Sequence, residues 1–352
     1  MRTSPAPQDA GFRIGTSSSS LTLQTVYTSD LLNSASGTFT AEVNSLSPST
    51  TYYYQAFMTV SDGNGGYTEI TSSTIGSFTT SGYVPAPPAG WLELPEVTGS
   101  EDFYGRFYGS GGTAGTDRNY SYNYSYTWYA SLWVAYPLSG THTSGSASTS
   151  SWKYNPDVAE DKQVNIVSNS YGTMYGASAY SRGHQCPNAS RKSDSDMNKQ
   201  TYYATNQTPQ LQNNFNGSIW SALENAERAL VSSASDTVYV VTGPAYTTVG
   251  GSETVTYLTG ASANANPSSL AVPNYYWKAF LKVKWDGGNI TSAKAIGFWF
   301  EHKNYTGSDY SSYAVSVDQI EAWTGFNLFA NLPDGIEEDA ETNTDWSAFR
   351  SF

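Results

Sequence analysis

Cysteine and histidine are scarce in this sequence of 352 residues, which contains one cysteine and three histidines. The single cysteine, Cys186, excludes an intrachain disulfide. The chain is nevertheless long enough for two domains and a sizeable core. A lone histidine is most often structural, because the ring packs well in partly buried positions. We interpret His142 and His302 in that way and consider His184 separately below.

Charge is also sparse, and positive charge in particular. Charged residues make up 13% of the sequence, and 17 Lys and Arg against 30 Asp and Glu give a net charge of −13. A nucleic-acid-binding protein is expected to present a basic surface, so this balance counts against that class. Most of the basic residues, however, fall between Lys153 and Lys303, whereas acidic residues gather near the end of the chain. We therefore allow for a small cationic cleft in an acidic protein.

Long apolar runs are missing as well. No stretch is long and apolar enough to span a membrane, and the first residues, Met1–Pro5, lack the apolar region of a signal peptide. Low charge with abundant Tyr, Ser, Thr, Asn and Gly suits an extracellular protein. We expect a secreted, cell-surface or periplasmic protein of bacterial type, whose signal was removed or which begins inside a longer chain. The sequence leaves the oligomeric state open.

Short β-type runs alternate with turn residues from Gly11 to Thr80, after a lead of ten residues that we expect to be flexible. The run Leu46–Tyr54 resembles the corner between two strands of fibronectin type III-like domains. This resemblance implies a β-sandwich, but the segment is shorter than the roughly 100 residues of an immunoglobulin-type sandwich. We expect a partial sandwich over residues 1–83. Its candidate strands are Leu21–Tyr27, Gly37–Val43, Thr51–Val60 and Gly76–Thr79.

A Pro-rich linker, residues 84–90, precedes a second domain over residues 91–352. This domain mixes strands rich in aromatic and β-branched residues with helical patterns. Its candidate strands are Tyr120–Tyr126, Ser131–Tyr136, Val238–Val241, Tyr276–Trp285 and Ala293–Phe300. We expect loops at Tyr171–Tyr180 and Gly250–Pro267. We also expect a short helix that begins with a capping box formed by Asp318 and Glu321 and ends at Gly325.

Polar residues suited to phosphodiester chemistry concentrate between Ser181 and Arg228. His184 follows Arg182 and Gly183, and Asn216, Glu224 and Arg228 follow on a predicted helix that Asn213 or Asn214 would cap. At roughly 100° per residue, Asn216 and Glu224 lie roughly 80° apart around an α-helix, with Arg228 roughly 40° beyond. Taken alone, the helix is more simply an amphipathic helix with an i,i+4 ion pair. The preceding histidine and amide-rich run favour a single-metal phosphodiesterase.

These segments resemble the DNA/RNA non-specific endonucleases, which have a ββα-metal (His-Me finger) core. The family pattern is Asp-Arg-Gly-His, then Asn-x-x-Pro-Gln, then Asn-x-x-x-Trp-x-x-x-Glu-x-x-x-Arg. Here it corresponds to Ser181–His184, Asn206–Gln210, and the series Asn216, Trp220, Glu224 and Arg228. The resemblance covers roughly residues 91–333 and implies an α+β fold with a mixed or antiparallel sheet. The combined motif is specific, although each piece alone is weak.

The resemblance implies a metal-dependent, sugar non-specific endonuclease that hydrolyses DNA and RNA to 5′-phosphate products. It implies that His184 is the general base and that Asn216 is the ligand of one Mg²⁺, for which Mn²⁺ can substitute. Glu224 would hold metal-bound water, and Arg182 and Arg228 would face phosphate. Our candidates for substrate binding are Arg191, Lys192, Asn206 and Gln210. For His184 we expect an ordinary imidazole pKa near about 6.5.

Two positions depart from the family pattern: the Asp before Arg-Gly-His is Ser181, and the segment before Trp152 lacks the family's usual Arg. Lys153, Arg191 or Lys192 would have to supply the missing cation. The departures keep an alternative open, namely a non-catalytic surface-binding protein with a decayed nuclease domain. A Cys186–His184 nucleophilic pair is a further option, but it leaves Asn216, Glu224 and Arg228 unexplained. We therefore interpret Cys186 as a small buried residue.

Overall fold

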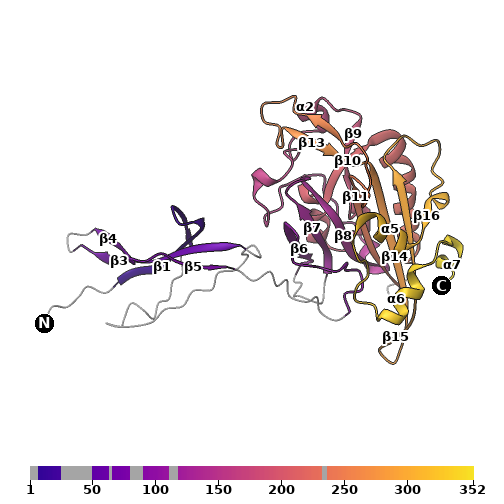
Figure 1. The fold of residues 1–352 in the computed structure, drawn as a ribbon, viewed down its shortest axis with the longest axis horizontal. Helices are drawn as coiled ribbons and strands as arrows, with labels where there is room; N and C mark the ends of the chain where they lie inside the picture. Colours follow the sequence, from indigo (N-terminus) through magenta and orange to yellow (C-terminus); the bar gives the residue numbers. More distant parts are fainter. Residues whose placement is uncertain (1–6, 25–49, 63–65, 80–89, 111–117, 232–235) are drawn as a thin grey trace. The chain divides into compact units, whose positions relative to one another are not determined.

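The computed structural model describes residues 7–24, 50–62, 66–79, 90–110, 118–231 and 236–352 (Figure 1). The chain folds as two compact units, Met1–Pro85 and Ala86–Phe352. In the described part of the chain, no helix has both the length and the apolar composition needed to cross a membrane.

The first unit contains one antiparallel sheet in its described part, with strand order β2-β1-β3-β4 and β5 also paired to β3. Its strands are β1 (Pro7–Ser17), β2 (Ser20–Gln24), β3 (Thr51–Ser61), β4 (Tyr67–Thr71) and β5 (Gly76–Thr79). The expected strands at Thr51–Val60 and Gly76–Thr79 are confirmed, whereas Gly37–Val43 lies outside the described residues. The expected flexible lead is wrong from Pro7 onwards, because β1 pairs with β3 there. A sandwich needs a second sheet, so the fibronectin type III-like fold stays a prediction.

A seven-stranded antiparallel sheet forms the centre of the second unit, in the order β16-β15-β14-β11-β8-β7-β6. All five strands expected from the sequence are present. The bounds are β6 (Phe103–Tyr108), β7 (Arg118–Ser125), β8 (Ala130–Ser139), β11 (Thr237–Ala245), β14 (Tyr275–Asp286), β15 (Asn289–Glu301) and β16 (Ala314–Val315).

Both faces of this sheet are covered, so its strands are apolar on two sides. Along β8, Val134 and Tyr136 belong to one hydrophobic core, and Trp133 and Ala135 belong to the other. This alternation follows from the two-residue period of a strand. The first core is covered by the helical segments η5 (Gln212–Trp220) and α4 (Ser221–Ala229). The second is covered by α5 (Val317–Thr324) and α6 (Asp334–Glu341), together with Trp91–Leu94.

Smaller elements decorate this core. Two-stranded sheets form from β9 (Tyr180–His184) with β10 (Gln207–Leu211) and from β12 (Thr256–Thr259) with β13 (Ser269–Val272). Short helical turns complete the unit: α1 (Gly140–Thr143), η2 (Glu160–Lys162), α2 (Tyr171–Tyr175), η3 (Asn188–Ser190), α3 (Ser195–Gln200), η4 (Ala204–Asn206), η6 (Ser311–Tyr313) and α7 (Trp346–Arg350).

Three sequence expectations need correction here. The expected loop at Gly250–Pro267 contains β12, and the expected loop at Tyr171–Tyr180 contains α2, whose two tyrosines are buried. The short helix does end at Gly325, which has a left-handed φ of 77°. Its cap, however, is Ser316, whose hydroxyl accepts the Gln319 N–H, because the helix begins one residue before Asp318.

A buried ion pair joins α4 to the sheet. Lys278 on β14 lies 2.9 Å from Glu227 on α4, and both side chains are 0% exposed. The Tyr136 hydroxyl on β8 donates to Glu227 Oε1 at 2.9 Å and accepts from Lys278 Nζ at 3.1 Å. Burial of two charges is tolerated only when further hydrogen bonds satisfy them, and this hydroxyl supplies such bonds to both partners. The pair fixes α4 over β8 and β14.

We expect Glu227→Gln to destabilise the protein by about 3–5 kcal/mol, because it leaves a buried ammonium without its counter-charge. Urea denaturation measures the loss. The control is Glu301→Gln, which breaks the exposed Lys303–Glu301 pair and should cost about 0–1 kcal/mol. The double variant Glu227→Gln/Lys278→Met should recover much of the loss. Equal effects of the buried and exposed substitutions would contradict the anchoring role.

Candidate active site

The motif forms a β-hairpin followed directly by a helix. Strands β9 and β10 are antiparallel, with His184 opposite Gln207 and Ser181 opposite Gln210. The helix starts at Gln212, one residue after β10 ends. The ββα arrangement expected from the resemblance is therefore present, and it lies on the sheet face that η5 and α4 cover (Figure 1).

Gly183 makes room for an amide that orients the predicted metal ligand. A Cβ atom at Gly183 would lie 2.2 Å from Cδ and Oε1 of Gln210, so the Gln210 side chain crosses the hairpin at this point. Gln210 Oε1 accepts a hydrogen bond of 2.7 Å from Asn216 Nδ2. This bond uses the amide nitrogen of Asn216 and leaves its Oδ1 directed elsewhere. Gln210 is fully buried, so the substrate contact expected for it is wrong; it positions Asn216 instead.

The helix begins with π-helical winding rather than α-helical winding. Segment η5 is a π-helix, in which the Ser221 N–H reaches back to the Asn216 carbonyl, and its cap, Leu211, makes no side-chain capping bond. Capping by Asn213 or Asn214 is therefore wrong. The angles calculated at 100° per residue do not hold between Asn216 and Glu224, because a π-helix has more residues in each turn. Single π-turns are frequent at functional sites.

The His184 ring packs against two aromatic rings, Trp152 and Tyr202, which also contact each other. Its ring centroid is 4.8 Å from that of Trp152 and 4.7 Å from that of Tyr202. Burial, with a contribution from the neighbouring Arg182 guanidinium, lowers the pKa of His184 to about 4. The sequence expectation of about 6.5 is therefore wrong, and the imidazole is neutral at physiological pH. In the sequence, the adjacent tyrosines Tyr202 and Tyr203 were the feature from which these aromatic contacts could have been predicted.

Arg182 lines a polar hollow of about 460 Å³ beside these rings. Its Nη1 donates to the carbonyl oxygens of Ile166 at 2.9 Å and Asn169 at 3.3 Å, and its guanidinium lies 5.2 Å from the Trp152 ring centroid. Ser150 and Ser151 line the same hollow, in the segment where the family usually has an Arg. Arg182 is the only charged residue among those that the structure describes lining the hollow.

Glu224 and Arg228 occupy one edge of α4. Burial raises the pKa of Glu224 to about 7, and the charge of Lys278 opposes this effect while that of Glu227 adds to it. Arg228 Nη2 donates to Asn225 Oδ1 at 2.6 Å, and Arg228 Nη1 is buried without a hydrogen-bond partner among the described residues. An unpaired guanidinium nitrogen beside a half-buried carboxyl group is an arrangement suited to a charged ligand.

Two cations predicted to contact substrate are used inside the protein. Arg191 is 0% exposed, and its donors bond Asn119, the Ser190 carbonyl and the Pro137 carbonyl at 2.7–2.9 Å. Its predicted role is therefore wrong. Lys192 Nζ donates to the Ala147 carbonyl at 3.0 Å and to Asn188 Oδ1 at 3.1 Å, which ties down the Ser-rich loop. Lys192 is half-buried and does not line the hollow beside Trp152, and its predicted substrate contact stays a prediction.

Asn206 is also a structural residue. It is 0% exposed; its Nδ2 donates to the carbonyls of Cys186 and Thr201, and its Oδ1 accepts the Cys186 N–H at 2.9 Å. These bonds close the long connection between β9 and β10, so the predicted substrate contact is wrong. Cys186 itself is buried, and burial raises the pKa of its thiol to about 11, which excludes a thiolate nucleophile at neutral pH.

The other two histidines are structural, as expected. His142 Nδ1 accepts the Ser139 N–H at 3.1 Å, and burial lowers the pKa of His142 to about 3. His302 Nε2 accepts the Leu211 N–H at 2.9 Å, which satisfies the backbone where β10 ends and the helix begins. The Nδ1–H of His302 donates to the Pro273 carbonyl at 2.9 Å.

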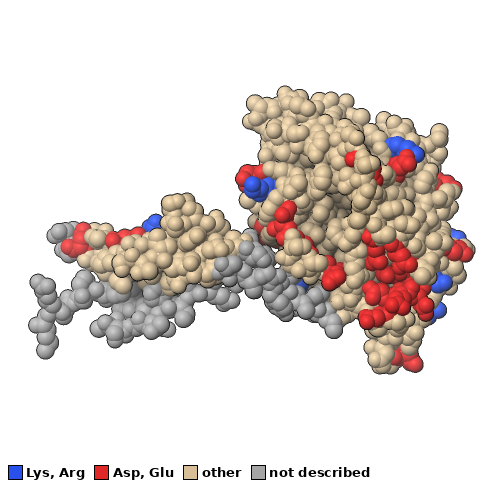
Figure 2. Space-filling view, in the orientation of Figure 1, with Lys and Arg blue, Asp and Glu red and all other residues tan. Residues whose placement is uncertain are grey.

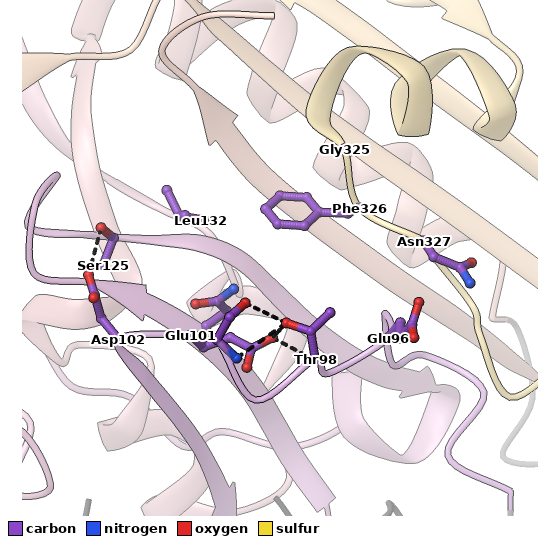
Figure 3. Close-up of a pocket in the computed structure, with 11 residues that line it drawn as sticks. Glu96, Thr98, Glu101, Asp102, Ser125, Leu132, Gly325, Phe326 and Asn327 are labelled. Atoms are coloured by element: carbon purple, nitrogen blue, oxygen red, sulfur yellow. Dashed lines mark hydrogen bonds between the residues drawn. The ribbon is translucent and has the colours of Figure 1, made fainter. Parts of the chain in front are cut away.

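A second hollow of about 370 Å³ contains none of the predicted site residues. Its lining includes Glu96, Glu101 and Asp102 (Figure 3), and the Glu101 carboxylate accepts the N–H groups of Thr98 and Gly99. Acidic walls repel phosphate. We therefore place substrate binding at the hairpin and helix rather than here.

A hairpin and helix bearing His, Asn, Glu and Arg fit the ββα arrangement that the resemblance implies. Residues 102–335 match the model of the DNA/RNA non-specific endonuclease family. The chain belongs to this family, and the function that membership gives is endonucleolytic cleavage of DNA and RNA.

Relatives from several organisms agree with this membership. A nuclease of Serratia marcescens is 31% identical over 223 residues, which cover 62% of this chain and 75% of that protein. A nuclease of Nostoc is 28% identical over 49% of this chain and 59% of its own length. The mitochondrial nuclease EXOG of Danio rerio is 30% identical over 61% of this chain and 60% of its own length. This chain therefore spans about three fifths of the last two proteins.

The fold is also similar to a solved structure, a crystal structure of the EndoG/EndoGI complex. The TM-score is 0.50 at 22% identity, over 62% of this chain and 85% of that chain. At this identity the similarity shows the fold alone. It supports the α+β architecture with its antiparallel sheet.

We expect Gly183→Ala and Gln210→Ala to weaken metal binding by the same route, because each removes the Gln210 amide from Asn216. Each should lower metal affinity by about 10–100-fold, the usual effect of losing a residue that orients a ligand. The double variant should be scarcely worse than either single variant, because the two changes are coupled. Metal titration by calorimetry measures this cycle. Fully additive losses would show that Gly183 acts by another route.

Proposed function

We propose that the second unit is a Mg²⁺-dependent endonuclease that cleaves DNA and RNA to products with 5′ phosphates, and that Mn²⁺ can replace Mg²⁺. The observation that carries the proposal is the orientation of Asn216. Its amide is fixed by Gln210 at the start of a helix that directly follows the strand pair bearing Arg182 and His184.

The side chains of Asn216 and Glu224 are suited to bind a hard divalent cation and its water. Asn216 donates one amide hydrogen to Gln210 and so offers its oxygen, the ligand type that Mg²⁺ prefers. Mg²⁺ keeps several waters when few protein ligands are present, and the half-buried Glu224 carboxyl group would hold one of them. The ion would supply positive charge at the scissile phosphate and the leaving oxygen.

His184 would take the proton from the attacking water. The rings of Trp152 and Tyr202 restrict the imidazole, so little orientational freedom is lost on reaction. A pKa of about 4 keeps the ring in the neutral form that accepts a proton. Arg182 next to it would bind a phosphate oxygen in the adjoining hollow, and Arg228 would bind the phosphate from the helix side.

The non-catalytic alternative rests on the two departures from the family pattern. Ser181 is accommodated structurally, because its hydroxyl donates to the Gln210 carbonyl across the hairpin. Without the family's Arg, Arg182 is the one charged residue among the described residues that line the hollow. This supports weak phosphate binding rather than loss of the reaction, since His184, Asn216, Glu224 and Arg228 all remain on the hairpin and helix. The low charge also leads us to propose an exported protein.

We expect Asn216→Ala to abolish metal-dependent cleavage of supercoiled plasmid while the melting temperature stays within a few degrees of the parent. The reason is that the half-buried amide is a ligand and not part of the core. Asn213→Ala, at an exposed position of the same π-helix, is the matched control and should keep full activity. An Asn216→Ala enzyme with normal turnover would refute the ligand assignment.

We expect kcat/KM to fall at low pH when His184 becomes protonated, with the midpoint of this fall near pH 4. Because the pKa of this group is depressed, the neutral base persists far below the about 6.5 of a free imidazole. Glu224 has a raised pKa of about 7 and can add a second limb. The profile is therefore measured in parallel in Glu224→Gln, which removes only that second limb.

A limb near pH 6.5 that survives in Glu224→Gln would contradict the environment assigned to His184. His184→Ala should lower turnover by about 10²–10⁴-fold, the usual contribution of a general base. It should still bind DNA, because the metal ligand and both arginines are unchanged. If turnover were near normal, another group would be the base.

A further inference from the structure

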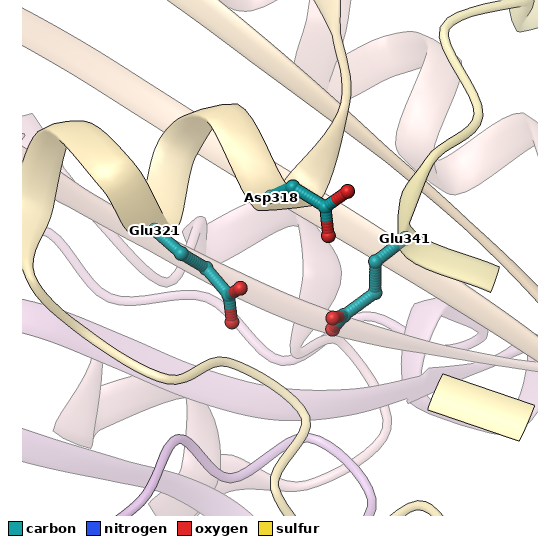
Figure 4. Close-up of side chains that lie close together, drawn as sticks. All are labelled: Asp318, Glu321 and Glu341. Carbon is teal, nitrogen blue, oxygen red and sulfur yellow. The ribbon is translucent and has the colours of Figure 1, made fainter. Parts of the chain in front are cut away.

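Three carboxyl groups converge between α5 and α6, on the sheet face opposite to the hairpin and η5. Asp318 and Glu321 come from α5 and Glu341 comes from the end of α6. One oxygen from each lies within 4.8 Å of the others. In Figure 4 the three side chains point toward a common space between the helices.

Glu341 is buried, and one of its carboxyl oxygens lacks a partner. The residue is 4% exposed, and its Oε1 is buried with no hydrogen bond from the described residues. Leaving a carboxyl oxygen in that state costs free energy unless a proton or a cation compensates it. Glu341 is directed into the space that Asp318 and Glu321 share (Figure 4). A buried, unsatisfied acceptor aimed at two further carboxylates is an incomplete ligand shell.

The surroundings strengthen the negative potential. Acidic side chains gather on this part of the face in Figure 2, over α5 and α6. One oxygen of Glu321 accepts the Leu328 N–H, which leaves its other oxygen for a ligand. A divalent cation would relieve the repulsion among these carboxylates.

We propose that Asp318, Glu321 and Glu341 bind one Ca²⁺ ion, which joins α5 to α6. Three oxygens evenly spaced around one Ca²⁺ at bond lengths of 2.3–2.6 Å lie up to about 4.5 Å apart. The three carboxyl groups, which lie within 4.8 Å of one another, therefore need at most a small movement to bind this ion. Mg²⁺, with bonds of 2.0–2.1 Å, would require them within about 3.6 Å and in a stricter octahedron. Ca²⁺ also accepts irregular sets of carboxylates and water.

The ion would act on stability and not on the reaction. Helix α6 covers the second core, where Ala340 packs beside Val317 and Ile320 of α5. A bound cation would hold the two helices together from outside that core. Because the ion binds the folded chain alone, it would raise the melting temperature in a concentration-dependent way.

Calorimetric titration of the full chain with CaCl₂ tests this site, in the Asn216→Ala background that disables the proposed catalytic metal site. We expect one Ca²⁺ per chain and a rise of several degrees in melting temperature at saturation. Glu341→Gln should remove both effects and still fold, because the amide is nearly isosteric with a protonated carboxyl group. Glu338→Gln, at an exposed position on the same helix, should keep both.

Absence of a Ca²⁺-dependent heat and melting shift in the parent would overturn the proposal. The same applies if Glu341→Gln binds Ca²⁺ as tightly as the parent. Equal affinity for Mg²⁺ would overturn the assignment to Ca²⁺. These readouts do not involve cleavage, so they are separate from the test of the proposed function.

Discussion

The buried contact between Lys278 and Glu227 determines where the site helix lies. With the Tyr136 hydroxyl it joins α4 to two strands of the central sheet. One turn away on the same helix, Glu224 is influenced by both charges. Arg191 belongs to the connection between β9 and β10, and its guanidinium lies 4.9 Å from the Tyr136 ring centroid. This connection therefore packs against the same Tyr136 that bonds Lys278 and Glu227. Hairpin and helix are thus held against one rigid sheet.

The net charge of −13 limits how the proposed site could bind phosphate. The site does not rely on a broad basic surface, because several nearby cations are used to build the fold. Arg191 and Lys192 bond protein carbonyls, and Lys199 pairs with Asp196 at 2.9 Å. Arg182 and Arg228 keep donor capacity near the proposed metal. We infer recognition that depends on one or two phosphates, with a weak contribution from long-range steering.

Much of the fold could be predicted from the sequence, because strands with aromatic and β-branched residues and the spacing of the motif are local signals. The roles of Arg191 and Asn206 could not be predicted. A charged or amide side chain in a motif suggests a surface contact. The burial of these two side chains depends largely on carbonyls from residues that are far away in the sequence, such as Asn119, Pro137 and Cys186. The low pKa of His184 was missed for the same reason, because it follows from burial and from the neighbouring Arg182. The π-helical start has no local signal that we recognised in the sequence.

We propose that the second unit cleaves polynucleotides internally with the help of a divalent metal. The most direct test is cleavage of supercoiled plasmid and of a structured RNA by the purified chain at low salt, with Mg²⁺ or with excess EDTA. We predict nicking followed by fragmentation of both substrates with Mg²⁺, 5′ phosphates at the new ends, and complete inhibition by EDTA. Cleavage that persists in EDTA, or intact substrates at saturating Mg²⁺ and Mn²⁺, would contradict this proposal.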